Sequence, residues 1–444
     1  MRLTSRSRTN HPRASLYVAA LAAVVAASGC SDFYVPPPDS CTPADEKEFV
    51  YEVMDQVYLW NHTIPDRESL NFAEYEEASD LLQALKYKEY DRWSYIVDKV
   101  KSDALFKEGK FVGFGFTHKV DSDGRVRLIF VHENSPAWRA GMRRGDEFTS
   151  INNYLIADIE ADSMWGDIWG ENEPGVEGTF HVRTVEGEEF TTTIQRDWID
   201  IVTVPVAEAI DYAGERVGYL NFSSFVGYAE DELDAAWDMF NDEGITSLVV
   251  DLRYNGGGSV SIARHLIDLL VGAHTEGDGL AYWVEYNDDL SDENDYRNLH
   301  NPSRSIDLDH ITFITTGRSL SASELVINSV RAHIPTYIVG GTTGGKPVGS
   351  KRYEFCDKIL WPITFRIRNA DGVSDYFDGI APDCAASDDL DRQLGDADEE
   401  MLAVALAAPR VGCIDPAEDP EPGTGDPTPD VGVDPLSRIL GGAR

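Results

Sequence analysis

The stretch Ser247-Leu-Val-Val-Asp-Leu-Arg-Tyr-Asn-Gly-Gly-Gly258 decides the fold, because it joins two kinds of segment. It contains the apolar run Leu248–Val250, which is typical of a buried strand, and it ends in glycines. The next apolar segment, Ile262–Val271, predicts a helix. A buried strand that leads through glycines into a helix predicts an α/β sheet, with a loop whose backbone a ligand can approach closely.

The same alternation continues on both sides of this stretch. Before it, Val217–Phe222 predicts a strand and Ala229–Phe240 an amphipathic helix. The segment Asn287–Arg304 is polar and has little periodicity, so we expect an excursion loop there. Further strands are expected at His310–Thr316, Thr336–Val339 and Trp361–Arg368, and a further helix at Ser321–His333.

The part of the chain that precedes this α/β region has a different pattern of apolar residues. From about Ala44 to Lys110 the pattern is helical, and a second helix is expected around Tyr75–Leu85. From about 111 to 198 short strands and turns follow. The apolar face of the first helix is formed by Phe49, Val53, Val57 and Trp60.

These patterns predict a multidomain α/β protein with six regions. They are a signal peptide (1–29), a Pro-rich tether (30–43), a small helical segment (44–110), a β-domain (111–198), an α/β core (199–410) and a disordered acidic tail rich in Pro and Gly (411–444).

The charge of the chain limits its partners. Its 444 residues carry 38 Lys and Arg against 78 Asp and Glu, a formal net charge of −40. Nucleic acid and anionic lipid surfaces both require a basic footprint, so neither is expected as the main partner.

The N-terminus has the pattern of an export signal. A basic start is followed by the short apolar segment Leu16–Ala27 and then by Ala27-Ser28-Gly29-Cys30, which describes a secretory signal peptide. The junction resembles a bacterial lipobox, in which the thiol of Cys30 would be acylated. The alternative is a plain signal peptide with an incidental cysteine. The weak signal of Ser31 and Asp32 favours an outer-membrane destination.

The remaining cysteines predict disulfides rather than a metal site. The chain contains no Cys-x-x-Cys and no Cys/His cluster at zinc spacing, so no metal or other cofactor is expected. In an oxidising compartment the four remaining cysteines suggest two disulfides, with three possible pairings. We favour Cys356–Cys384 and Cys41–Cys413.

Two stretches of the β-domain together resemble a PDZ domain of the bacterial protease type. One is Gly113-Phe114-Gly115-Phe116, and the other is Ser135-Pro-Ala-Trp-Arg-Ala-Gly-Met-Arg-Arg-Gly-Asp-Glu-Phe148. A Gly-Phe-Gly-Phe loop frees backbone N–H groups to hold a terminal carboxylate, and the next strand can pair with the bound peptide. The alternative is a small β-domain that binds nothing.

Ser321 stands where a strand ends and a helix begins, in Ser319-Leu-Ser-Ala-Ser-Glu324. At a helix N-terminus, the N–H of Ala322 and the helix dipole favour a developing negative charge, so Ser321 is a candidate nucleophile. The alternative is a purely structural role, because Ser321 and Glu324 also form a capping-box pattern.

Lys346 is the candidate base. No lysine occurs between Lys119 and Lys346, yet one stands in the loop Gly344-Gly-Lys-Pro347. A lysine can act as a general base where an apolar site lowers its pKa, whereas an arginine cannot. The alternative is a solvated loop lysine. His333 would lie too far along the helix from Ser321, and His265 is expected to pack inside a helix.

The glycines after Asp251-Leu-Arg-Tyr-Asn255 can supply an N–H to an oxyanion. A phosphate-binding loop is a weaker interpretation, since no Gly-Lys-Ser/Thr follows.

These pieces, in this order, resemble the tail-specific, or C-terminal processing, protease family of serine peptidases. The late stretch Phe377-Asp-Gly-Ile-Ala-Pro-Asp383 fits the family's closing motif, and the resemblance covers about 45–410. It implies Ser321 as nucleophile and Lys346 as base. It also implies an oxyanion hole formed by the N–H groups of Ala322 and of one glycine of the pair Gly256 and Gly257.

One position departs from the family pattern. Many members carry Gln four residues after the lysine, where it helps to orient the lysine, and here that residue is Ser350. Either the Ser350 hydroxyl replaces it or the lysine is held less firmly, and Glu324 is a second candidate to orient the site.

The sequence therefore predicts an exported, lipid-anchored bacterial serine endopeptidase that recognises polypeptide C-termini and contains a crotonase-like core of ββα units. One rival is a non-catalytic lipoprotein that keeps the fold and captures peptide tails. The other is a crotonase-like enzyme of acyl chemistry, which the PDZ-like stretch and the export signal disfavour.

Overall fold

The computed structural model describes residues 34–121 and 123–413. The described residues from Val35 onward belong to one compact unit. The predicted signal peptide, Cys30 and the acidic tail beyond residue 413 lie outside the described residues. Among the helices of the described ranges, none has the length and apolar character needed to cross a membrane.

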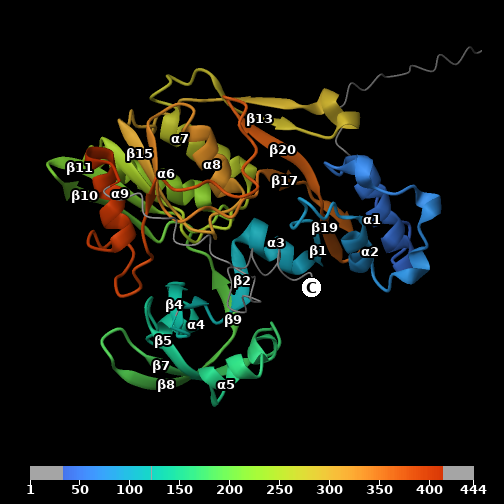
Figure 1. Cartoon of the computed structure of the whole chain (residues 1–444), viewed down its shortest axis with the longest axis horizontal. Helices are drawn as coiled ribbons and strands as arrows, with labels where there is room; N and C mark the ends of the chain where they lie inside the picture. Colours follow the sequence, from blue (N-terminus) through green and yellow to red (C-terminus); the bar gives the residue numbers. More distant parts are fainter. Residues whose placement is uncertain (1–33, 122, 414–444) are drawn as a thin grey trace, which may run out of the picture. The chain divides into compact units, whose positions relative to one another are not determined.

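A six-stranded sheet forms the core, in the order β10-β11-β12-β15-β16-β21 (Figure 1). The five strands from β11 to β21 run parallel, and β10 pairs with β11 antiparallel at the edge. The α/β alternation predicted from the sequence is confirmed. The strands are β10 (Val206–Tyr212), β11 (Glu215–Asn221), β12 (Ser247–Asp251), β15 (His310–Thr315), β16 (Thr336–Gly340) and β21 (Cys384–Ala385).

Helices cover both faces of this sheet because its strands alternate apolar side chains between two clusters. On β12, Leu248 and Val250 join one cluster and Val249 joins the other, as the two-residue period of a strand requires. The first cluster includes side chains of α6 (Ala229–Glu243), α7 (Val260–Val271) and α8 (Ala322–Val330). The second includes side chains of α9 (Glu400–Val411).

A second sheet has four strands in the order β14-β13-β20-β17. It corrects the excursion loop predicted at Asn287–Arg304, which contains a 3-10 helix, η5 (Asp288–Glu293), and a strand, β14 (Asp295–Asn298). The sequence pattern did not predict β14 because it is a polar edge strand whose side chains are mostly exposed. The rings of Trp283 on β13 and Tyr296 on β14 stack with centroids 5.5 Å apart. The other strands are β13 (Leu280–Glu285), β17 (Val348–Ser350) and β20 (Ile363–Asn369).

The N-terminal segment packs against the core through a shared sheet. The predicted helices are present as α1 (Pro43–Val57) and α2 (Ala78–Leu85), and α3 (Lys99–Glu108) follows. The segment is not wholly helical, however, because β1 (Tyr95–Asp98) pairs with β19 (Lys358–Trp361). The smaller elements are η1 (Asn61–Thr63), η2 (Arg67–Ser69), η3 (Phe72–Glu74) and β18 (Tyr353–Phe355), which pairs with β19.

A separate β-sheet builds the β-domain around an aromatic cluster that includes Phe114, Phe116, Phe148 and Phe180. An antiparallel pair, β2 (Lys110–Gly113) and β9 (Asp197–Asp200), flanks this domain at its two ends. Its elements are β3 (Phe116–Val120), β4 (Val126–Val131), α4 (Pro136–Arg139), β5 (Glu147–Ile151), β6 (Tyr154–Leu155), α5 (Ile156–Ala161), η4 (Met164–Gly166), β7 (Glu177–Arg183) and β8 (Glu189–Gln195).

Two disulfides form, but the favoured pairing is wrong. Cys41 pairs with Cys356, and Cys384 pairs with Cys413. Cys41 lies just before α1 and reaches the turn between β18 and β19, whereas Cys413 follows α9, which packs on the sheet that contains β21. The pairing depends on which turns meet in space, and cysteine spacing does not carry that information.

Candidate active site

Ser321 occupies a strained position at the start of α8. It is the N-cap residue of the helix, and its backbone has φ 57° and ψ −109°. A positive φ is uncommon for a residue with a Cβ. It persists mainly where the surrounding structure enforces the strained backbone. The side chain is half-buried. Ser321 therefore caps the helix and stands on a sharp turn between a strand and a helix, the position from which the sequence predicts a nucleophile.

The carboxylate of Glu324 joins Ser321 to the lysine loop. One oxygen, Oε2, accepts hydrogen bonds from the Ser321 N–H at 2.9 Å and from the Lys346 N–H at 2.8 Å. The other, Oε1, accepts from the Gly345 N–H at 2.7 Å and from the Thr343 hydroxyl at 2.5 Å. Burial raises the pKa of Glu324, and these four hydrogen bonds oppose that rise. The carboxylate thus brings the backbones of the two predicted catalytic residues together.

Lys346 is buried rather than solvated. It is 8% exposed, and burial lowers the pKa of its amine to about 8, against the opposing charges of Asp91 and Glu324. The ring of Trp93 lies with its centroid 6.0 Å from Nζ. A lysine with a pKa near 8 is substantially neutral at mildly alkaline pH and can accept a proton.

The glycine loop lies directly against the nucleophile. A Cβ added to Gly257 would stand 2.9 Å from the Ser321 Cβ and 3.0 Å from the Ala322 nitrogen, so only glycine fits this contact. Gly257 also has φ +101°. Asn255 shapes the loop: its Oδ1 accepts from the Gly257 N–H at 2.9 Å, and its carbonyl accepts from the Leu320 N–H at 3.2 Å.

The backbone N–H groups of Gly256 and Ala322 are the candidate donors to an oxyanion. The N–H of Gly257 is committed to Asn255, so Gly256 is the glycine of the pair with a free donor. In the described part of the chain, neither the Gly256 N–H nor the Ala322 N–H donates to a protein acceptor. Ala322 is the first residue of α8, where N–H groups have no helical acceptor. This arrangement offers two backbone donors beside Ser321.

Ser350 does not orient the lysine in this structure. Its hydroxyl is buried and has no hydrogen-bond partner among the described residues. Of the two candidates named from the sequence, Glu324 is the one that bonds to the lysine loop, through the Lys346 backbone.

The sequence did not single out the residues that surround the lysine from the N-terminal segment. Asp91 and Trp93 lie between α2 and β1, more than 250 residues from Lys346 in the chain. Their sequence, Asp91-Arg-Trp-Ser94, carries an Asx-turn pattern but no spacing that ties it to a distant loop.

The strand before the glycine loop is anchored by a buried charge network that sequence reasoning also missed. Arg253 is fully buried and donates to Glu399 through two nitrogens, at 2.8 and 2.9 Å, and to Asp251 at 3.0 Å. It also pairs with Asp388, which in turn pairs with Arg144 of the β-domain at 2.6 Å. Arg253, which precedes the glycine loop, is thus held in place by a network that includes Asp388, Glu399 and Arg144.

The two histidines considered from the sequence lie in structural contacts. His265 Nε2 pairs with Asp234 at 2.8 Å, and His333 Nε2 lies 3.0 Å from the Leu280 carbonyl oxygen. Within residues 34–121 and 123–413, no cluster of three or more His, Cys, Asp or Glu side chains could hold a metal ion.

The loop Gly113–Phe116 presents backbone donors at the edge of the β-domain. The Phe114 carbonyl accepts from the Ala137 N–H at 3.0 Å, and the Gly115 carbonyl accepts from the His132 N–H at 2.8 Å. Among the described residues, the N–H groups of Phe114 and Gly115 donate to no acceptor. Both phenylalanine rings are buried in the aromatic cluster, so they fix the loop.

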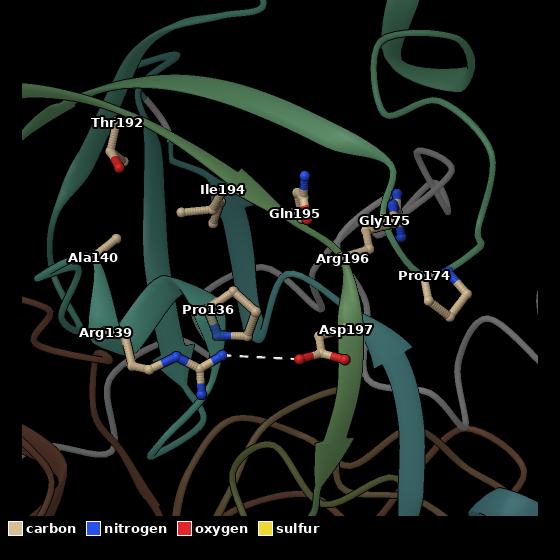
Figure 2. A pocket seen from close by; sticks show the side chains of 10 residues that line it. All are labelled: Pro136, Arg139, Ala140, Pro174, Gly175, Thr192, Ile194, Gln195, Arg196 and Asp197. Atoms are coloured by element: carbon tan, nitrogen blue, oxygen red, sulfur yellow. Dashed lines mark ion pairs between the residues drawn. The ribbon is translucent and has the colours of Figure 1, made fainter.

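A hollow of about 540 Å³ lies elsewhere on the β-domain, between α4 and the end of β8. Figure 2 shows Arg139 and Asp197 facing each other across it, and their charged atoms are 4.0 Å apart. None of the four loop residues lines this hollow. It is therefore distinct from the predicted carboxylate-binding loop.

Two family models match the chain. The model of the peptidase S41 N-terminal domain matches residues 45–95, and the model of peptidase family S41 matches residues 216–386. The first range contains Asp91 and Trp93, and the second contains the glycine loop, Ser321 and Lys346.

Curated relatives agree with these matches. A probable CtpA-like serine protease of Staphylococcus haemolyticus is 24% identical over 289 residues, covering 64% of this chain and 55% of the relative. One of Staphylococcus aureus is 26% identical over 279 residues, covering 62% of this chain and 52% of the relative. The chain thus spans about half the length of these relatives.

A solved structure shares the fold. The crystal structure of a Bacteroides fragilis protein assigned to the S41 proteases has a TM-score of 0.64 and 23% sequence identity. The match covers 81% of this chain and 96% of the Bacteroides fragilis chain.

Replacement of Glu324 tests the bridge between Ser321 and the lysine loop. Glu324→Ala leaves four buried donors without an acceptor, and an unsatisfied buried donor costs about 1–3 kcal/mol. We expect the free energy of unfolding, measured by urea denaturation, to fall by about 3 kcal/mol or more. Thr343→Ser is the matched control, since it keeps the hydroxyl that donates to Glu324 and accepts from the Ile380 N–H, and it removes only a methyl group worth about 1 kcal/mol. Equal losses in the two variants would contradict the bridging role.

Proposed function

We propose that this chain, which belongs to peptidase family S41, is a serine-type endopeptidase in which Ser321 is the nucleophile and Lys346 is the general base. The observation that carries the proposal is the shared acceptor Glu324 Oε2, which binds the backbone N–H groups of both residues. It joins a strained serine at the start of a helix to the loop of a buried lysine, the two residues that the proposed reaction requires.

The proposed reaction follows from the atoms at the site. Neutral Lys346 takes the hydroxyl proton of Ser321 as Oγ attacks the scissile carbonyl carbon. The carbonyl oxygen gains negative charge, and the N–H groups of Gly256 and Ala322 stabilise it. The protonated lysine then donates its proton to the leaving amine, which leaves an acyl-serine. Neutral Lys346 then takes a proton from water as the water oxygen attacks this ester. The lysine gives that proton to Ser321 Oγ as the bond between Oγ and the acyl carbon breaks, which releases the second product and restores the hydroxyl and the neutral amine.

We propose polypeptide C-termini as the recognised ligands, through a PDZ-like use of the β-domain. The unpaired N–H groups of Phe114 and Gly115 support this proposal, because a terminal carboxylate is an acceptor for such donors. The adjacent strand β3 supports it too, since β3 is an edge strand of its sheet and pairs only with β4 among the described strands. An extended peptide can therefore add to that edge.

We further propose that the protein is exported and lipid-anchored to a bacterial membrane. The support is the sequence Ala27-Ser28-Gly29-Cys30 after an apolar segment, together with the disulfides of the described region, which persist in an oxidising compartment.

The dyad is tested by turnover of an unfolded protein substrate across pH. Because only the neutral amine is a base, activity should rise with pH and level off above an apparent pKa of about 8. Below this value it should fall about tenfold per pH unit, as the neutral fraction does. Lys346→Arg keeps a positive charge but cannot lose it at usable pH, so it should be as inactive as Ser321→Ala.

Lys358→Arg is the matched control, because Lys358 forms an ion pair with Glu46 away from the site and the variant should keep wild-type activity. Residual activity of Lys346→Arg above a few per cent would show that another residue is the base. A wild-type chain that binds peptides without cleaving them would favour the non-catalytic rival.

Binding of acid and amide forms of one peptide tests C-terminal recognition, with Ser321→Ala used so that the peptide survives. Hydrogen bonds to a charged acceptor contribute about 1.5–3 kcal/mol, so amidation should weaken binding at least about tenfold. Gly115→Ala should remove the preference, because its Cβ would stand 2.0 Å from the Ser135 Cβ. Gly124→Ala is the control: its φ of +74° brings backbone strain comparable with that at Gly115, whose φ is +93°, but no atom lies within 4 Å of its added Cβ. Equal affinity for acid and amide would refute the proposal.

Replacement of Cys30 tests the anchor. Cys30→Ser removes the thiol that would carry the lipid, so the protein should move from the membrane fraction to the soluble fraction or remain unprocessed. Fractionation and the mass of the mature chain report the result. Membrane association of the variant with an unchanged mature mass would refute lipidation at this residue.

A further inference from the structure

We propose that Asp91, on the turn between α2 and β1, is a positioning residue for the general base, so that the N-terminal segment completes the catalytic site. The inference rests on the proposed function of Lys346. It concerns a residue that touches neither the nucleophile nor the oxyanion donors, and that acts through the lysine and the ring of Trp93.

Asp91 organises its own turn. It is 3% exposed, and its Oδ1 accepts hydrogen bonds from the Trp93 N–H at 2.9 Å and from the Ser94 N–H at 2.8 Å. Its Oδ2 accepts from the Tyr58 hydroxyl at 2.7 Å. Both oxygens are therefore bonded, and the backbone that carries the Trp93 ring is fixed from within the turn.

The turn is also attached to the core. The Ser94 hydroxyl oxygen accepts from the Ile363 N–H of β20 at 2.9 Å, and the Arg92 guanidinium donates to the Phe377 carbonyl at 3.2 Å. The rings of Trp93 and Phe377 stack with centroids 6.4 Å apart. The same Phe377 carbonyl packs against Gly345, where an added Cβ would stand 2.2 Å from its oxygen. The turn and the lysine loop therefore rest on the same short segment.

Burial and charge act on the pKa of Lys346 in opposite directions. The tryptophan ring helps to exclude water from Lys346, which favours the neutral amine, although its face also attracts the ammonium. The charges of two carboxylates, Asp91 on the turn and Glu324 on α8, favour the protonated form. Burial is the largest effect and lowers the pKa. The Asp91 charge limits that decrease, which keeps the amine basic enough to take the serine proton. Asp91 also acts on a second buried ammonium, that of Lys86, where burial lowers the pKa and the Asp91 charge opposes this.

The test is Asp91→Asn, which keeps an oxygen acceptor for the turn but removes the charge. Without this charge the pKa of Lys346 falls further, so the acidic limb of the pH–activity profile should move to lower pH by about half a unit or more. A residue with only a structural role would lower the rate at all pH values without moving the limb.

Two variants separate charge from position. Glu89→Gln removes a negative charge from an exposed residue of the same connection and should leave the profile unchanged. Tyr58→Phe removes the hydrogen bond to Oδ2 but keeps the carboxylate, so it should lower the rate without moving the limb to lower pH. If Asp91→Asn does not fold, Asp91→Ser replaces it, because a serine hydroxyl can accept the same turn hydrogen bonds.

A second readout does not depend on turnover. In the Ser321→Ala background, the rate at which acetic anhydride labels Lys346, followed by mass spectrometry of its peptide across pH, reports the pKa of that amine directly. We expect Asp91→Asn to lower this pKa by about half a unit or more, in agreement with the activity profile. Unchanged or raised values with Asp91→Asn overturn the inference. Absence of turnover in the wild type would instead overturn the proposed function, and the labelling experiment would still decide the role of Asp91.

Discussion

The buried carboxylate of Glu324 is the interaction on which the rest of the site depends. A buried charge must have its acceptor capacity filled, and here a hydroxyl and three N–H groups fill it. Those donors come from the start of α8 and from the loop that carries Lys346. Because the carboxylate cannot relax into solvent, it holds both segments at fixed distances. The strained backbone of Ser321 is thus maintained by the same contact that positions the lysine loop.

Other segments close around this centre through contacts of the same kind. Thr343, which donates to Glu324, also accepts from the Ile380 N–H at 2.7 Å, so the closing motif is fixed to the lysine loop. Arg253 fixes the other side, where its ion pairs with Glu399 and Asp251 precede the glycine loop. Buried charges and hydrogen bonds, rather than the apolar clusters alone, set the geometry of the reactive groups. The apolar clusters place the sheet and helices, and the polar contacts place the loops between them.

The sequence predicted what depends on local pattern. The apolar strand Leu248–Val250, the glycines after it and the helix that starts at Ser321 all follow from short-range periodicity and turn chemistry. Contacts between distant loops could not be predicted in this way. The turn of Asp91 and Trp93 reaches the lysine loop only because it packs on Phe377, and the disulfides pair as they do only because particular turns meet. The hydroxyl of Ser350 has the chemistry expected of an orienting group, but its place on β17 leaves it without a hydrogen-bond partner among the described residues.

The disulfide between Cys41 and Cys356 joins residues 315 positions apart and encloses nearly every part of the site. A ribosome releases the chain from its N-terminus, so the turn with Trp93 emerges long before the lysine loop and the segment at Phe377. Until those last segments arrive, Glu324 lacks three of its donors and Lys346 has no enclosure. A partly synthesised or truncated chain therefore carries Ser321 without the enclosed lysine. The site is in this way assembled only once nearly all of the residues that the disulfide encloses have been made.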